Sequence, residues 1–204
     1  GVAVLLKDIA PQAGEIFRPL FSGVGDVNLK RAPLVLALII LVLSTLGGLG
    51  FVPTLITVLG VWVTTAMAAT LTGQTGIDPM EVFGILVLLA VKAVSTPAPQ
   101  TAFFVAAVVA VACGLAGDNL QDFKAGYILK TIPQAQIYAE LIGGVVGAVV
   151  SVVVLFVLRQ AYGAMGPGTE LVAPQAYAVA TMVNGLPNVP AFGIGLTLGI
   201  ALYF

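Results

Sequence analysis

Long stretches of this 204-residue chain contain no charged side chain. Asp, Glu, Lys and Arg are absent from residues 32–77, 141–158 and 171–204, and Lys92 is the only charged residue in 82–117. Charged residues make up 8% of the chain, whereas a soluble domain carries roughly 25%. Because one membrane-spanning helix needs about 20 apolar residues, these stretches predict about six or seven passes through a bilayer, some of them partial.

The remaining composition agrees with an all-α, polytopic transmembrane helical bundle. Hydrophobic residues make up 59% of the chain, and its mean hydropathy is +1.11. The 24 glycines and 12 prolines predict broken or re-entrant helices, which membrane proteins tolerate. With Cys113 as its one cysteine the chain cannot form an internal disulfide, and it has no histidine, the usual metal ligand. We therefore expect no metal site and no cofactor, and the net charge of −1 argues against a nucleic-acid partner.

The pattern divides the chain into two parts. Residues 1–31 hold apolar side chains at helical spacing with charges between them, which predicts an amphipathic or cytoplasmic lead-in segment. Gly1 is not an initiator methionine and Phe204 lies in an apolar stretch, so we interpret the chain as part of a larger membrane protein. Residues 32–204 form the transmembrane domain, with helices predicted at 33–48, 53–71, 79–94, 97–116, 133–158, 174–183 and 189–204.

A polar break separates the second predicted helix from the third. The sequence TGQTG ends one helix at Gly76, and DPME begins the next at Asp78. In a structural interpretation, Asp78 caps the helix, Pro79 takes its first position, and Glu81 returns a capping-box hydrogen bond. In a functional interpretation, Asp78 and Glu81 bind a proton or a cation at membrane depth, where acidic residues generally serve function. Both interpretations stay open at this point.

The polar segment, residues 117–130, reads GDNLQDFKAGYILK and lies between two long apolar stretches. It follows a predicted helix that ends near residue 116, so we expect a loop. Its first residues fit a helix-capping pattern that begins at Asp118. Asp122 and Lys124 could then form an ion pair. We weigh an ordered cytoplasmic loop against a gate that lines a transport pathway with Asp118, Asn119, Gln121, Asp122 and Lys124.

Two predicted helices begin with the same three residues, Ala-Pro-Gln. The first begins after Pro97, with Pro99 and Gln100, and the second begins with Pro174 and Gln175. Proline is common in the first turn of a helix, so the pattern predicts two helix starts. A repeat of this kind also occurs between the halves of transporters.

The second of these helices, residues 174–183, is too short to cross about 30 Å of hydrocarbon. It is either a tilted pass broken by loop residues or a re-entrant half-helix. The ends of half-helices expose unpaired backbone groups and a dipole, which suit the binding of substrates or ions. In that case three polar side chains would face a cavity: Gln100, Gln175 and Asn184.

No pattern typical of an enzyme is present in the chain. It lacks GxSxG, HExxH, a Walker loop and a cysteine pair. Lys92 is the one basic residue within an apolar helix, and we interpret it as a side chain that snorkels to the membrane interface rather than as a nucleophile. We therefore expect no catalytic residues.

Residues 116–127, AGDNLQDFKAGY, resemble a block of the oligopeptide transporter superfamily, which includes the yellow-stripe-like metal-chelate transporters. That block reads AG-[ED]-x-LQDFK-x-GY-x-L. Residues 127–133 resemble the lysine-to-proline segment that follows it. Peptide-transporting members carry KIPPR there, and this chain departs from that motif at Thr131, Gln134 and Ala135.

Two shorter matches extend the resemblance over residues 26–204. Residues 75–80, TGIDPM, resemble the family's TG-x-NP break between helices, with Asp78 where asparagine is usual. Residues 173–176, APQA, resemble a helix start of the family.

The resemblance implies a secondary active transporter, built from repeated halves and driven by protons, that moves small peptides or metal–chelate complexes. The chain would belong to its C-terminal half and lie in the plasma membrane. Its partners would be the lipid bilayer, the substrate, protons and the remaining helices of the parent chain. The acidic residues are then the candidates for proton coupling: Asp78, Glu81, Asp118 and Asp122.

Functions of other kinds stay open. A channel or pore would conduct without coupling and would carry a polar stripe along one helix, which the sequence does not show. A membrane-embedded enzyme would need a catalytic cluster at one depth. A structural subunit of a membrane complex would look the same in sequence, because missing helices and a missing partner chain leave the same apolar surfaces.

Overall fold

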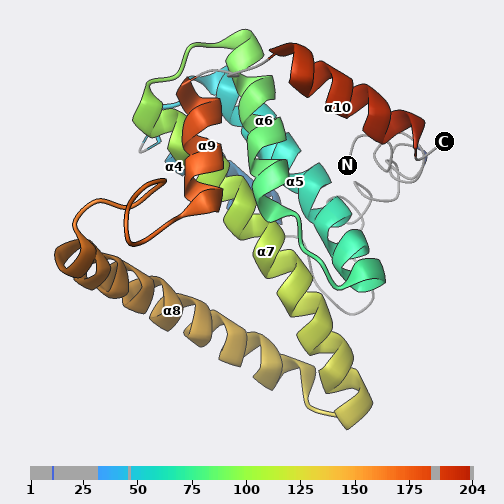
Figure 1. Cartoon of the computed structure of the whole chain (residues 1–204). Coiled ribbons are helices and arrows are strands. Elements are labelled where there is room, and N and C mark those ends of the chain that lie inside the picture. Colours follow the sequence, from blue (N-terminus) through green and yellow to red (C-terminus); the bar gives the residue numbers. More distant parts are fainter. Residues whose placement is uncertain (1–10, 12–31, 46, 185–188, 203–204) are drawn as a thin grey trace.

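The computed structural model describes residue 11 and residues 32–45, 47–184 and 189–202. Over this described part the chain forms seven helices and no strand (Figure 1). The predicted all-α helical bundle is therefore confirmed, whereas the lead-in segment 1–31 lies outside the described residues except for residue 11. The helices are α4 (Ala32–Thr45), α5 (Phe51–Thr75), α6 (Met80–Val94), α7 (Pro99–Leu129), α8 (Pro133–Tyr162), α9 (Pro174–Asn184) and α10 (Val189–Ala201).

Three of these helices are long and apolar enough to cross a membrane. α5 has 25 residues, α7 has 31 and α8 has 30. At about 1.5 Å per residue, α7 is about 46 Å long and exceeds the hydrocarbon thickness of about 30 Å. α4, α6, α9 and α10 have 14, 15, 11 and 13 residues, fewer than the roughly 20 of a full crossing. Long spanning helices and short helices are therefore combined in one bundle.

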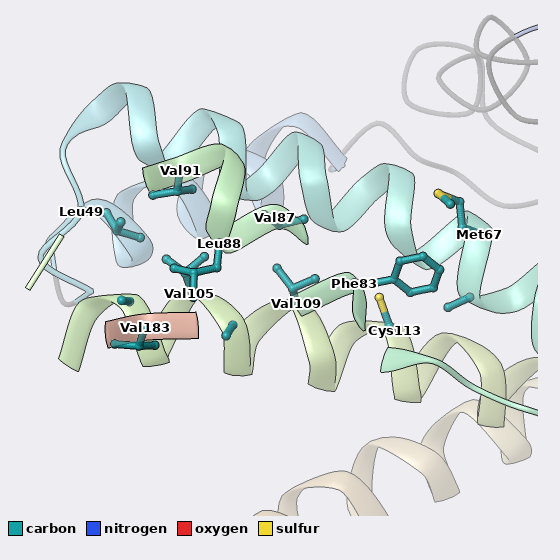
Figure 2. Packing of buried hydrophobic residues seen from close by; sticks show 13 residues of the cluster. Leu49, Met67, Phe83, Val87, Leu88, Val91, Val105, Val109, Cys113 and Val183 are labelled. Carbon is teal, nitrogen blue, oxygen red and sulfur yellow. The ribbon is translucent and has the colours of Figure 1, made fainter. Parts of the chain in front are cut away.

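The core lies where α5, α6 and α7 pack against one another, with α9 against α6 and α7 (Figure 1). Figure 2 shows Leu88 of α6 beside Val105 of α7 and Phe83 of α6 beside Cys113 of α7, and all four are fully buried. Lipid is as apolar as these side chains, so their packing is stabilised by van der Waals contact rather than by the exclusion of water.

Two glycines let these helices approach closely. A Cβ on Gly84 of α6 would lie 2.8 Å from the carbonyl oxygen of Ala106 on α7. A Cβ on Gly60 of α5 would lie 2.7 Å from the methyl carbons of Val87 on α6. Any larger residue would force the helices apart, as expected where membrane helices pack through small residues.

The polar segment, residues 117–130, is not a loop. α7 runs without interruption from Pro99 to Leu129 and contains all of this segment except its last residue. The predicted loop and the predicted cap at Asp118 are wrong, because polar composition indicates contact with water and not a break in the backbone. The segment contains no proline, and α7 ends only at Lys130, whose φ of 57° is left-handed. A helix as long as α7 can carry the last of these polar residues beyond the hydrocarbon.

α8 extends away from the core (Figure 1). It follows α7 after a tight turn, in which the Thr131 N–H donates a hydrogen bond to the Gly126 carbonyl at 2.9 Å. None of the side chains of α8, all of which are described, is buried. Its glycines do not contact another helix either: a Cβ on Gly143 or Gly147 would meet no atom within 4 Å in the described structure.

Candidate functional site

The break between α5 and α6 is built by one glycine and one proline. α5 ends at Gly76, whose φ of 70° is left-handed, and the Gly76 N–H donates to the Thr72 carbonyl at 2.9 Å. Pro79 then precedes the first residue of α6, and its carbonyl accepts hydrogen bonds from the N–H groups of Val82 and Phe83 at 3.0 and 3.3 Å. Asp78 therefore lies in a short connection between two packed helices.

The predicted capping box at this break is wrong. Pro79, not Asp78, occupies the N-cap position of α6, and no side chain caps the helix. Both carboxylate oxygens of Asp78 are shielded from solvent, and neither has a hydrogen-bond partner among the described residues. Because Pro79 takes the capping position, the Asp78 side chain does not cap the helix.

The Asp78 carboxylate points toward α7. One of its oxygens, Oδ2, lies 3.0 Å from the position that a Cβ of Gly117 would take. The hydroxyl oxygen of Thr72, near the end of α5, also lies 3.0 Å from that position. The two oxygens are therefore no more than 6.0 Å apart. Thr72 of α5, Asp78 of the break and Gly117 of α7 thus lie together at one place in the structure.

Negative charges surround this place. Burial raises the pKa of Asp78, and the negative charges of Asp118 on α7 and Glu81 on α6 raise it further. A carboxyl group with a raised pKa takes up a proton more readily than an exposed aspartate does. The structure therefore brings together three of the four acids that the sequence analysis selected.

A second polar contact lies at the other end of α6. The Lys92 ammonium donates hydrogen bonds to the carbonyl oxygens of Val183 at 2.7 Å and Met182 at 3.3 Å. These carbonyls belong to the last turn of α9, where a helix leaves its carbonyls without intrahelical partners and a cation is favourable. Lys92 thus has acceptors inside the protein, and its snorkelling to the membrane interface stays a prediction.

This contact fixes one end of a short helix. α9 has 11 residues and is about 17 Å long, much shorter than the hydrocarbon. Lys92 follows Asp78 by fourteen positions, which corresponds to about 20 Å along α6. The two polar places therefore lie at opposite ends of one short helix.

The other selected residues lie on exposed surfaces. Gln100 and Gln175 stand in the first turns of α7 and α9, after Pro97 with Pro99 and after Pro174, and Asn184 ends α9 next to the Lys92 contact. In the last turns of α7, Gln121, Asp122 and Lys124 are exposed and Asn119 is half-buried. The ammonium of Lys124 lies 5.5 Å from the centre of the Tyr127 ring.

Three polar residues of interest were not selected from the sequence. Thr72 gives no signal there, because α5 contains seven threonines. Lys92 and Glu140 do carry a signal, since each is a single charge within a long apolar stretch. Both carboxylate oxygens of Glu140 on α8 are shielded, and they have no hydrogen-bond partner in the part of the chain described here.

One hollow in the core region is apolar. It is an open groove of about 360 Å³ between α5 and α6, lined by residues such as Ile56, Met67 and Phe83. Nothing in its lining could bind the charged ends of a peptide or a chelate. Within the described ranges, moreover, no three His, Cys, Asp or Glu side chains are placed to hold a metal ion.

Comparison with known proteins gives one family and several partial relatives. The model of the family described as OPT oligopeptide transporter protein matches residues 28–204. A Haemophilus influenzae protein named "Putative oligopeptide transporter" is 37% identical over 94 residues, which cover 42% of this chain and 15% of that protein. No solved structure matches the chain significantly.

Plant proteins match the same share of the chain. The "Probable metal-nicotianamine transporter YSL10" of Oryza sativa subsp. japonica is 31% identical over 100 residues, 43% of this chain and 15% of that protein. The "Probable metal-nicotianamine transporter YSL5" of Arabidopsis thaliana is 34% identical over 91 residues, 39% of this chain and 13% of that protein. The matched part of the chain thus spans about one seventh of the length of these relatives.

Proposed function

The chain belongs to the OPT oligopeptide transporter family, and we propose that it is part of a proton-coupled secondary transporter for small peptides or metal–chelate complexes. It lies in a membrane as part of a multi-pass bundle, in keeping with its apolar helices of spanning length. Its role in this proposal is to carry ions and substrate past broken helices, not to catalyse a reaction.

The observation that carries the proposal is the unpaired carboxylate of Asp78. A buried carboxylate without a partner is costly, so a protein that keeps one at a helix break in a membrane domain generally uses it. A proton neutralises the group and removes most of that cost. Burial and the negative charges of Glu81 and Asp118 favour the protonated form of Asp78, so in this proposal Asp78 is the group that gains and loses the coupling proton.

The half-helix α9 supports the same proposal. Half-helices in transporters bring helix ends to the middle of the membrane, where those ends bind substrates and ions. α9 is held at its C-terminal end by Lys92 and begins at Pro174 beside the exposed Gln175. We place the substrate pathway near the ends of α9 and the α5–α6 break, completed by helices outside this chain, because the groove between α5 and α6 is apolar.

The substrate class follows from the relatives. One is named as an oligopeptide transporter and several as metal-nicotianamine transporters, so both classes belong in the proposal. The departures from KIPPR at Thr131, Gln134 and Ala135 favour a metal–chelate complex as the first substrate to test.

The test is uptake by proteoliposomes that hold the full-length protein containing this chain. One set receives chelated iron and another a mixed peptide pool, each with and without an inward proton gradient. We expect uptake of one of them to depend on the gradient and to be lost in Asp78→Asn but not in Asp122→Asn, which changes an exposed acid of α7. Ion leak that does not depend on the gradient would favour a channel, and uptake that Asp78→Asn leaves unchanged would remove Asp78 from the mechanism.

A further inference from the structure

We infer that Thr72, Asp78 and Gly117 form a binding site for one small monovalent cation, either hydronium or Na⁺. Its use as a coupling site rests on the proposed transport function, whereas the binding itself does not. The site combines a hydroxyl from α5, a carboxylate from the α5–α6 break and a position without a side chain on α7.

Thr72 differs from every other threonine of α5. All of α5 lies within the described residues, and six of its seven threonines donate their hydroxyl hydrogen to a carbonyl four residues earlier, as Thr54, Thr64 and Thr70 do. The Thr72 hydroxyl has no partner in the described structure, although the residue is only 5% exposed. A buried hydroxyl without a partner costs free energy. This one lies no more than 6.0 Å from Asp78 Oδ2, so one bound ligand could contact both groups.

Gly117 provides the room. A Cβ there would lie 3.0 Å from both the Thr72 hydroxyl oxygen and Asp78 Oδ2, a contact so tight that these neighbours would have to shift. Gly117 is buried, whereas Gly73 in the same region of α5 is exposed and would meet no atom within 4 Å. The missing side chain of Gly117 thus leaves space directly between two unpartnered oxygens.

The size and charge of this space select a small cation. Two oxygens that each lie 3.0 Å from one position can both contact a single small ion or hydronium near it, at about 2.8 Å. The titratable groups around Asp78 are Glu81 on α6 and Asp118 and Cys113 on α7, so the site disfavours anions. A divalent metal would need more ligating side chains than this one carboxylate and one hydroxyl.

The experiment measures cation-dependent thermal stability of the purified full-length protein in detergent. A ligand that binds only the folded state raises Tm with its concentration. One arm replaces choline chloride by NaCl at constant ionic strength at pH 8, and the other lowers the pH without sodium. A rise of Tm with NaCl assigns the site to Na⁺. A rise only on acidification assigns it to hydronium if the two variants below reduce it, because protonation of Asp78 alone would raise Tm in the variants as well.

Two variants and two matched controls locate the effect. Thr72→Val removes the hydroxyl at constant shape, and Gly117→Ala places a methyl group between the oxygens. We expect each to weaken the apparent cation affinity about tenfold, the value of a hydrogen bond to a charged group. Thr70→Val and Gly73→Ala change an exposed threonine and an exposed glycine of α5, and we expect them to keep the full response.

The inference is overturned if the wild-type Tm responds to neither cation, or if Thr72→Val and Gly117→Ala respond as the wild type does. Where either variant fails to fold, Thr72→Ser, which keeps the hydroxyl, should retain the response and Thr72→Ala should lose it. A cation response without uptake of peptide or chelate would leave the site standing and remove the proposed function. Proton-driven uptake, together with a Tm response to cations that Thr72→Val and Gly117→Ala leave unchanged, would support the proposed function and remove the site.

Discussion

The α5–α6–α7 core and α8 are made of similar residues but behave differently. All four helices are rich in Val, Leu, Ala and Gly, yet α5, α6 and α7 bury side chains against one another and α8 buries none. In the core, Gly60 and Gly84 lie against neighbouring helices, whereas Gly143 and Gly147 of α8 face open space. Apolarity therefore places a helix in the membrane, and the fit of small residues decides whether it packs there.

The largest expected effect concerns the side chain at the centre of the core. Phe83→Ala removes a fully buried ring of α6 and should lower the free energy of unfolding by about 3 kcal/mol, because a cavity remains. Phe156→Ala on α8 removes a ring that is 66% exposed and should change it little. Denaturation of the full-length protein by SDS in mixed micelles measures both, and equal losses would show that α8 is packed as tightly as the core.

A smaller effect is expected where a methyl group is added to a close helix contact. Gly84→Ala would bring a Cβ within 2.8 Å of the Ala106 carbonyl oxygen and should destabilise the protein by about 2 kcal/mol through the shift it forces on α6. Gly147→Ala on α8 should be neutral or slightly stabilising, because alanine favours helix more than glycine does. The same denaturation titration compares the two, and a neutral Gly84→Ala would contradict the close packing of α6 on α7.

Loss of the contact between Lys92 and α9 should destabilise the protein somewhat less than Gly84→Ala does. Lys92→Met removes two hydrogen bonds to the last turn of α9 and should loosen that end by about 1.5 kcal/mol. Hydrogen exchange in residues 174–184 should then speed up by about tenfold, since 1.4 kcal/mol corresponds to a factor of ten. Lys92→Arg should restore most of the protection, and Lys124→Met should not change it. Unchanged exchange in Lys92→Met would mean that packing alone holds α9.

The smallest expected effect is a dependence of stability on pH. The pKa of Asp78 is raised in the folded protein, so its ionised form costs stability above that pKa, and the cost disappears as the pH falls through it. Asp78→Asn should therefore be more stable than the wild type at neutral pH, by less than the effects above, and the difference should vanish in acid. Unfolding titrations at a series of pH values test this, and a difference that is independent of pH would indicate that Asp78 does not titrate in this range.

Several features of the fold could be predicted because they depend on residues next to one another. The charge-free stretches predict membrane helices, and the two Ala-Pro-Gln sequences mark the starts of α7 and α9. Gly76 and Pro79 separate α5 from α6 as local backbone preferences require. The helical structure of the polar segment could not be predicted in this way. Polar residues indicate contact with water, but a long helix can carry them out of the membrane without ending.

The polar sites depended on residues far apart in the chain. Thr72 and Gly117 meet Asp78 only because α5 and α7 pack beside the break, and Lys92 reaches Val183 over 91 positions. No local pattern separates Thr72 from the six other threonines of α5, so the sequence carries no signal for it.

By itself the sequence determined that this protein lies in a membrane, is helical and has breaks at defined residues, because burial in lipid and backbone preferences act position by position. The tertiary structure alone decided which helices pack, which stay exposed and which polar groups meet. The physical reason is that in a membrane a lipid-facing side chain and a packed side chain are both apolar. Hydrophobic periodicity, which marks the buried face of a helix in water, therefore does not identify the partner of a helix in lipid.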